Sequence, residues 1–193
     1  MSSNLNIIVS PLEQNDREQF ILGNKELLNS VPQRNLEWDH FEEDGEIISR
    51  KTIEDSIDSK NAKTYRIILD NKKIGVVVLK IDEKNKKGEL ELLFINLEIH
   101  SKGAGYSTWL MIEKMYPEIE IWETLTPYFE KRNIHFYINK FGFQIVDYYH
   151  KYHPLPKRPH DQDKKDGEEE FEMFRFQKII KKWNKYIFIL NIE

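Results

Sequence analysis

A glycine-containing turn, residues 102–107 (Lys-Gly-Ala-Gly-Tyr-Ser), is the part of this chain whose residue types point most directly to chemistry. It follows an apolar strand pattern over residues 90–97 and precedes a helical pattern. Gly103 and Gly105 permit backbone conformations and close approach that a Cβ would forbid. The unpaired N–H groups and the positive dipole at a helix N-terminus favour phosphate. The sequence therefore predicts an anion site at the start of this helix.

A second motif lies downstream, in residues 133–143. It contains Asn133, then the pair Phe136 and Tyr137, and ends with Gly142 followed by Phe143. The pattern predicts a short helix that ends at the glycine, followed by a new strand.

The two motifs, in this order, resemble those of the GNAT superfamily of acetyl-CoA-dependent acyltransferases. The first family motif is Gln/Arg-x-x-Gly-x-Gly/Ala, and residues 100–105 read His-Ser-Lys-Gly-Ala-Gly. His100 replaces the usual Gln or Arg, which removes one side-chain contact to the phosphates. The resemblance extends over residues 64–149.

The resemblance implies one α/β domain over residues 1–193, with a mixed, twisted sheet of about six or seven strands and helices on both faces. It also implies acetyl-CoA as cosubstrate. The residues expected to contact it are Phe94, Ile95, His100, Ser101, Lys102, Gly103, Ala104, Gly105, Tyr106, Ser107, Asn133 and Lys140. Asn133 is expected to bind the pantetheine arm, to cap a helix, or to do both.

Glu89 and Glu91 are the candidate bases for direct attack of a primary amine on the thioester. An amine with a pKa near ~10 is mostly protonated at neutral pH, so a base must remove its proton. The two glutamates are two residues apart on a predicted strand and share one face unless a bulge intervenes. The resemblance places Glu89 where some family members carry a glutamate base. The alternative for each is a position on the solvated side of a half-exposed strand.

Tyr137 is the candidate proton donor to the departing thiolate, because the family often places a tyrosine at this position near the thioester sulfur. The alternative is a buried tyrosine whose hydroxyl group is simply hydrogen bonded.

Composition limits the class of protein. The net charge is −4, which argues against nucleic acid as a partner, and there is no cysteine to serve as a nucleophile or a thiolate ligand. No apolar run is long enough to cross a bilayer, so we expect a soluble cytoplasmic protein. A homodimer remains open.

The candidate metal ligands are His150, His153 and His160, with Asp161. They have no regular ligand spacing, so we expect no metal site.

The elements that must position these residues follow from periodicity and turn residues. Strands are expected at residues 6–9, 65–69, 74–81, 89–96, 119–124, 144–152 and 171–176. Helices are expected from Asp16, over residues 52–59, after Gly103, and from Thr126-Pro127 as N-cap and first helical residue. Residues 153–170 are expected to form a mobile loop, and residues 179–193 are ambiguous.

The function predicted is N-acetylation of a small-molecule or peptide amine. A polyamine, an aminoglycoside, an amino acid and a protein amine all remain open as acceptors. The alternative function is a non-catalytic acyl-CoA-binding or regulatory module. A carboxylate near the thioester favours the enzyme, whereas a closed, apolar acceptor side favours the module.

Overall fold

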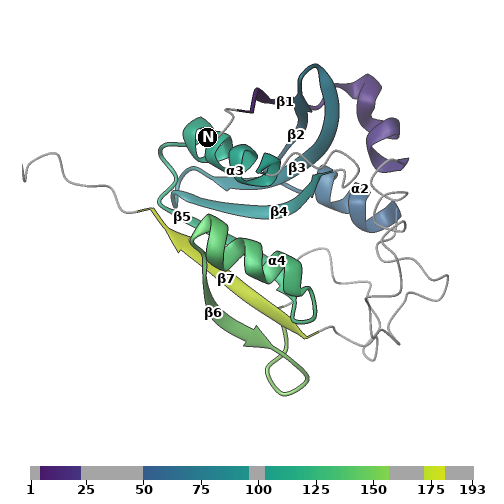
Figure 1. The fold of residues 1–193 in the computed structure, drawn as a ribbon. Coiled ribbons are helices and arrows are strands. Elements are labelled where there is room, and N and C mark those ends of the chain that lie inside the picture. Colours follow the sequence, from purple (N-terminus) through teal and green to yellow (C-terminus); the bar gives the residue numbers. More distant parts are fainter. Residues whose placement is uncertain (1–4, 23–49, 96–102, 157–171, 181–193) are drawn as a thin grey trace, which may run out of the picture.

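The computed structural model describes residues 5–22, 50–95, 103–156 and 172–180, which form an open seven-stranded sheet with helices (Figure 1). The strands are β1 (Ile7–Pro11), β2 (Ala62–Leu69), β3 (Lys72–Asp82), β4 (Lys87–Ile95), β5 (Ile121–Pro127), β6 (Gln144–Tyr149) and β7 (Met173–Ile179). The helical segments are η1 (Gln14–Asp16), α2 (Arg50–Asp58), α3 (Ala104–Met115), α4 (Lys131–Phe136) and η3 (Tyr137–Phe141), besides a helical stretch at residues 17–22.

The strand order is β1-β2-β3-β4-β5-β7-β6, and the pairing of β4 with β5 is parallel whereas the other pairings are antiparallel. The β2–β3 hairpin turns at Asp70 and Asn71, both of which have positive φ. Two such residues form the turn whose twist matches that of the paired strands. The predicted mixed sheet is therefore confirmed.

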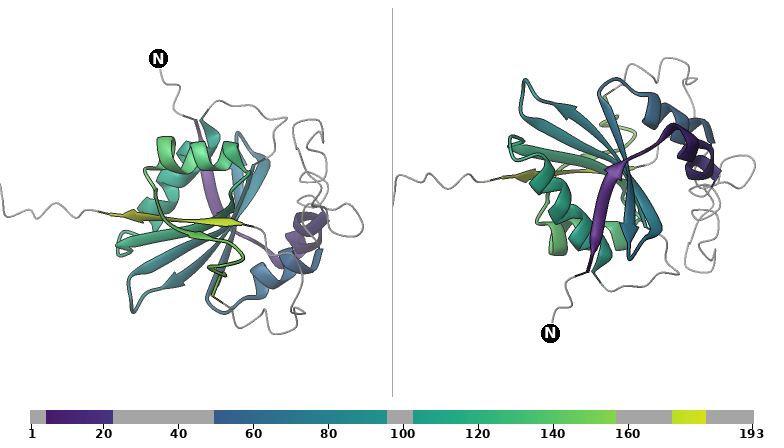
Figure 2. Two further views of the ribbon diagram at one scale, coloured as in Figure 1. Left: turned by 90° about the horizontal axis from the view of Figure 1, so that it is seen from below. Right: turned by 90° about the horizontal axis from the view of Figure 1, so that it is seen from above.

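Helices cover both faces of the sheet, as Figure 2 shows. On one face, Val77 and Leu79 of β3 belong to a buried cluster that includes Trp109 of α3. On the other face, Val76 and Val78 pack with the helical stretch at residues 17–22 and with α2. Because successive side chains of a strand point to opposite faces, β3 joins the two cores and is apolar along most of its length. The predicted helices on both faces are confirmed.

One predicted helix start is wrong. Thr126 and Pro127 form the end of β5, where they pair with β7, and α4 begins only at Lys131. The period-2 alternation of β5 is the physical reason, since Trp122, Thr124 and Thr126 are buried on one face while the residues between them are only half-buried. The strand pattern therefore continues through a pair that is also typical of a helix N-terminus.

Gly88 of β4 allows the side chain of Trp122 to pack flat against the strand. A Cβ at Gly88 would lie 2.3 Å from Trp122 Cζ3, and Trp122 is fully buried. We expect Gly88→Ala to lower the free energy of unfolding by about 1–3 kcal/mol, because the indole must shift in a packed core. Chemical denaturation measures this loss. Lys87→Ala, at the exposed neighbouring position, is the control and should change stability by less than about 0.5 kcal/mol; equal effects would contradict the packing argument.

Candidate active site

Strands β4 and β5 separate just beyond Glu89. Their parallel pairing covers three residue pairs and ends with Glu89 opposite Glu123. One residue further on, the hydroxyl of Thr124 donates a hydrogen bond to the carbonyl oxygen of Leu90 at 2.8 Å. The Thr124 side chain thus bridges the two strands at the point where they begin to separate. Beyond this point, the edge of β4 that faces β5 has no strand partner among the described residues.

A β-bulge in β4 falls at Glu91. Val78 of β3 pairs with Leu92 and Leu79 pairs with Leu90, so that Glu91 is the extra residue. We expected Glu89 and Glu91 to share one face of the strand unless a bulge lay between them, and such a bulge is present. Bulges re-aim side chains and occur near functional sites.

Despite the bulge, the side chains of Glu89 and Glu91 both lie on the face of the sheet that packs against α2. Lys80 of β3 lies directly opposite Glu89, and it forms an ion pair with Glu91 in which Nζ and Oε2 are 2.8 Å apart. Lys80 follows Val76 and Val78 in the alternation of β3, and those residues pack beneath α2. The Glu91 side chain is only 11% exposed and is held by this lysine.

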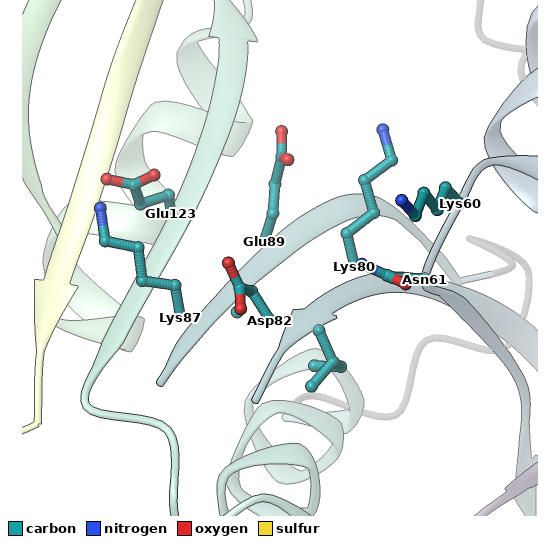
Figure 3. Close-up of a pocket in the computed structure, with 9 residues that line it drawn as sticks. Lys60, Asn61, Lys80, Asp82, Lys87, Glu89 and Glu123 are labelled. Carbon is teal, nitrogen blue, oxygen red and sulfur yellow. The ribbon is translucent and has the colours of Figure 1, made fainter. Parts of the chain in front are cut away.

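A polar pocket of about 250 Å³ opens on the same face, where β3, β4 and β5 meet the end of α2 (Figure 3). Its lining residues are Lys60, Asn61, Lys80, Ile81, Asp82, Lys87, Gly88, Glu89 and Glu123. In Figure 3 the Glu89 carboxylate lies between the lysine side chains of β3 and β4. The pocket therefore offers both signs of charge around one candidate base.

Glu123, the neighbour of Glu89 across the parallel pair, is bound by β7. Arg175 donates to it at 2.8 Å and Gln177 at 3.0 Å. Burial by itself would raise the pKa of Glu123, but these hydrogen bonds and the charges of Arg175 and Lys87 hold that pKa below its usual value. Glu123 is thus a charged carboxylate with its own partners, which makes it a poor candidate for accepting a proton.

Tyr137 approaches the separation point from the opposite face of the sheet. Its ring is buried among Phe141, Phe143 and Phe176. Its hydroxyl is hydrogen bonded with the side chains of Thr126 and Thr124, and burial raises the pKa of this phenol. The group therefore stays protonated at neutral pH. Thr124, which closes the separation point, links Tyr137 to β4.

The predicted anion turn leads directly into α3. Gly103 has φ of 112°, in the region that favours glycine, and its carbonyl accepts the N–H of Ser107 at 2.9 Å. Ala104 is buried, Tyr106 is exposed and Ser107 is half-buried. Gly105 has a further role, since a Cβ there would lie 3.3 Å from Phe136 of α4. The predicted contacts His100, Ser101 and Lys102 lie outside the described residues.

Two of the other predicted cosubstrate contacts lie at the end of β4, and the remaining two lie in α4 and η3. Phe94 and Ile95 are half-buried at the end of β4, whereas Asn133 and Lys140 are exposed. The N-cap of α4 is Glu130, so the alternative that Asn133 caps this helix is wrong.

Several residues of the site have no local sequence motif. Strand pairing brings them to the site, and the only sequence signal was the alternation of polar and apolar residues along their strands; they are Lys80, Glu123, Thr124, Arg175 and Gln177.

Neither a metal site nor a membrane helix is found in the parts of the chain described. No group of three or more His, Cys, Asp or Glu side chains there is placed to hold a metal ion, and no helix there is long and apolar enough to cross a membrane. His153 instead contacts Asp147 at 3.0 Å, while His160 and Asp161 lie outside the described residues.

Comparison with known proteins identifies a relative and a fold. No family model matches the chain. The chain is 42% identical over 142 residues to the uncharacterized protein YrkN of Bacillus subtilis, an alignment that covers 72% of this chain and 77% of YrkN. The ribosomal-protein-S18-alanine N-acetyltransferase of Escherichia coli superposes with a TM-score of 0.60 at 11% identity, covering 94% of this chain and 99% of that one. A GNAT family acetyltransferase of Elizabethkingia anophelis, with acetyl-CoA bound, superposes with a TM-score of 0.57 at 17% identity, covering 91% and 99%.

Proposed function

Because the chain belongs to the same family as YrkN and has the fold of the GNAT acetyltransferases, we propose that it transfers an acetyl group from acetyl-CoA to a primary amine. The observation that carries this proposal is the separation of β4 from β5, with a carboxylate on one face and a buried phenol on the other. Those are the two proton-handling groups that aminolysis of a thioester requires.

The cosubstrate would lie along the edge of β4 that β5 leaves unpaired. The backbone groups of residues 91–95 on that edge can bind an extended pantetheine arm as a neighbouring strand would. The strand then leads toward α3, whose N-terminus favours the pyrophosphate. Among the described residues, the proposed contacts are Phe94, Ile95 and the turn at Gly103, together with Asn133 of α4 and Lys140 of η3.

Glu89 is the proposed base. It accepts the proton of the acceptor ammonium, directly or through one water, and the neutral amine attacks the thioester carbonyl carbon. Glu91 is the second candidate, but its carboxylate is already engaged in an ion pair with Lys80, in which Nζ and Oε2 are 2.8 Å apart.

Tyr137 completes the reaction. When the tetrahedral intermediate collapses, the carbon–sulfur bond breaks and the phenol gives its proton to the departing thiolate. The nitrogen releases its second proton to water as the amide forms, and the phenolate regains a proton from water. The hydroxyl groups of Thr124 and Thr126 orient the phenol. A covalent acyl-enzyme is not required, in keeping with a chain that has no cysteine.

The polar pocket beside Glu89 supports catalysis over a non-catalytic acyl-CoA-binding module. Such a module needs no charged cavity on the acceptor side, whereas an amine must leave water and meet a carboxylate. The test is a thiol-release assay with acetyl-CoA and a panel of amines. Amine-dependent release of CoA is expected; tight acetyl-CoA binding with no release for any amine would favour the module.

The turn at Gly103 provides a separate test of the cosubstrate site. We expect Gly103→Asp to weaken acetyl-CoA binding at least about tenfold, because it places a negative charge beside the phosphates. Gly103→Asn is the matched control, since both residues tolerate positive φ and only the charge differs. Calorimetry compares the two variants, and equal affinities would show that the phosphates bind elsewhere.

A further inference from the structure

Two lysines of the polar pocket form no ion pair with a carboxylate in the described part of the chain, although the charge of Lys87 acts on the nearby Glu123. Lys60 follows α2 and Lys87 begins β4, and both line the cavity (Figure 3). Neither forms an ion pair with a described residue, whereas Lys80 is engaged by Glu91. The pocket therefore presents two ammonium groups that are available to an anionic ligand.

Two of the pocket's acidic groups are already bound within the protein. Glu123 receives hydrogen bonds from Arg175 and Gln177. Asp82 accepts from the backbone N–H of Asn85 at 3.1 Å and from its side-chain amide at 2.6 Å, which ties it to the turn between β3 and β4. These carboxylates are poorly placed to bind a second cationic group of an acceptor.

We propose that the acceptor carries a carboxylate close to its amine, as a free amino acid does. This inference rests on the proposed function. The amine meets Glu89, and the carboxylate is bound by Lys87 or Lys60 through charge-assisted hydrogen bonds. A polyamine would bring a second ammonium against these lysines, and like charges repel most strongly in a partly desolvated site.

The size of the cavity agrees with this class of acceptor. Its volume of about 250 Å³ lies below the ~300–1,000 Å³ of sites for drug-sized ligands. A compact amino acid fits such a space better than an aminoglycoside does.

Matched pairs of acceptors test the inference. Lysine with cadaverine, ornithine with putrescine, and phenylalanine with phenethylamine differ only by the carboxylate. We expect kcat/KM to be at least about tenfold higher for the amino acid of an accepted pair, the effect of one charge-assisted contact. Equal or higher values for the decarboxylated amines would overturn this inference and leave the proposed function intact. Turnover of no amine in the panel would overturn both.

Lysine variants locate the contact. Lys87→Met and Lys60→Met remove the charge and keep most of the side-chain volume. Lys86→Met is the control, because Lys86 is exposed, pairs with Glu120 and does not line the pocket. In at least one of the two pocket variants, KM for the amino acid should rise about tenfold and the preference over its decarboxylated partner should disappear. The control should keep that preference. If both pocket variants keep it as well, the inference is wrong.

Discussion

Replacing Glu89 by Gln is expected to lower kcat about a hundredfold or more while leaving acetyl-CoA affinity unchanged. The amide keeps the size of the carboxylate but cannot accept the proton of the acceptor ammonium. Glu89 lies in the polar pocket on the face opposite Tyr137, away from the proposed phosphate turn. Steady-state rates and calorimetry on the same preparations measure the two quantities.

The pH profile separates loss of a base from loss of packing. With Glu89 in place, the rate falls as the pH drops through the pKa of the base, because the protonated carboxyl no longer accepts a proton. That acidic limb should vanish in Glu89→Gln. Glu91→Gln is the matched comparison, and we expect it to act mainly by releasing Lys80. Wild-type rates in both single variants and in the double variant would contradict the assignment.

Tyr137→Phe should lower kcat by roughly tenfold to a thousandfold with little change in KM for acetyl-CoA. The ring and its contacts with Phe141 and Phe176 are kept, and only the hydroxyl is removed. The free energy of unfolding should fall by about 1–3 kcal/mol, because the hydroxyls of Thr124 and Thr126 both lose a hydrogen-bond partner. Stopped-flow or steady-state CoA release, with chemical denaturation alongside, gives both numbers.

An acyl donor whose thiol leaves more easily distinguishes proton donation from positioning. Such a donor needs less help from an acid, so the defect of Tyr137→Phe should shrink with it. Tyr65→Phe is a control, since this half-buried tyrosine bonds Tyr116 and belongs to β2. An equal loss of rate for good and poor leaving groups would assign Tyr137 a packing or positioning role.

Local sequence signals predicted the parts of the fold that depend on neighbouring residues. The Asp70-Asn71 turn has the chemistry of a hairpin, and the glycine turn before α3 has the backbone conformation that glycine favours. Tyr137 was proposed as a proton donor from the family resemblance of residues 133–143, a motif that ends at Gly142, which has positive φ in the structure. Each of these features is written within a few consecutive residues.

The features that the sequence did not predict depend on contacts between segments that are far apart in the chain. Glu123 and Arg175 are 52 residues apart and meet only because β7 pairs with β5. The bulge at Glu91 is set by the register of β3 against β4, which alternation within one strand does not reveal. At Thr126-Pro127 a local helix signal was overruled by burial of Thr126 in the strand. The polar pocket is therefore the part of the candidate site that the sequence predicted least.

Following the acetyl group itself tests whether the protein acetylates an amine. The protein is incubated with deuterated acetyl-CoA and an amine panel that includes the matched acceptor pairs, and the amines are then analysed by mass spectrometry. Acetyl transfer with Glu89 as the base predicts a labelled N-acetyl product in an amount equal to the CoA released, with both lost in Glu89→Gln. Bound acetyl-CoA with no label on any amine would contradict it.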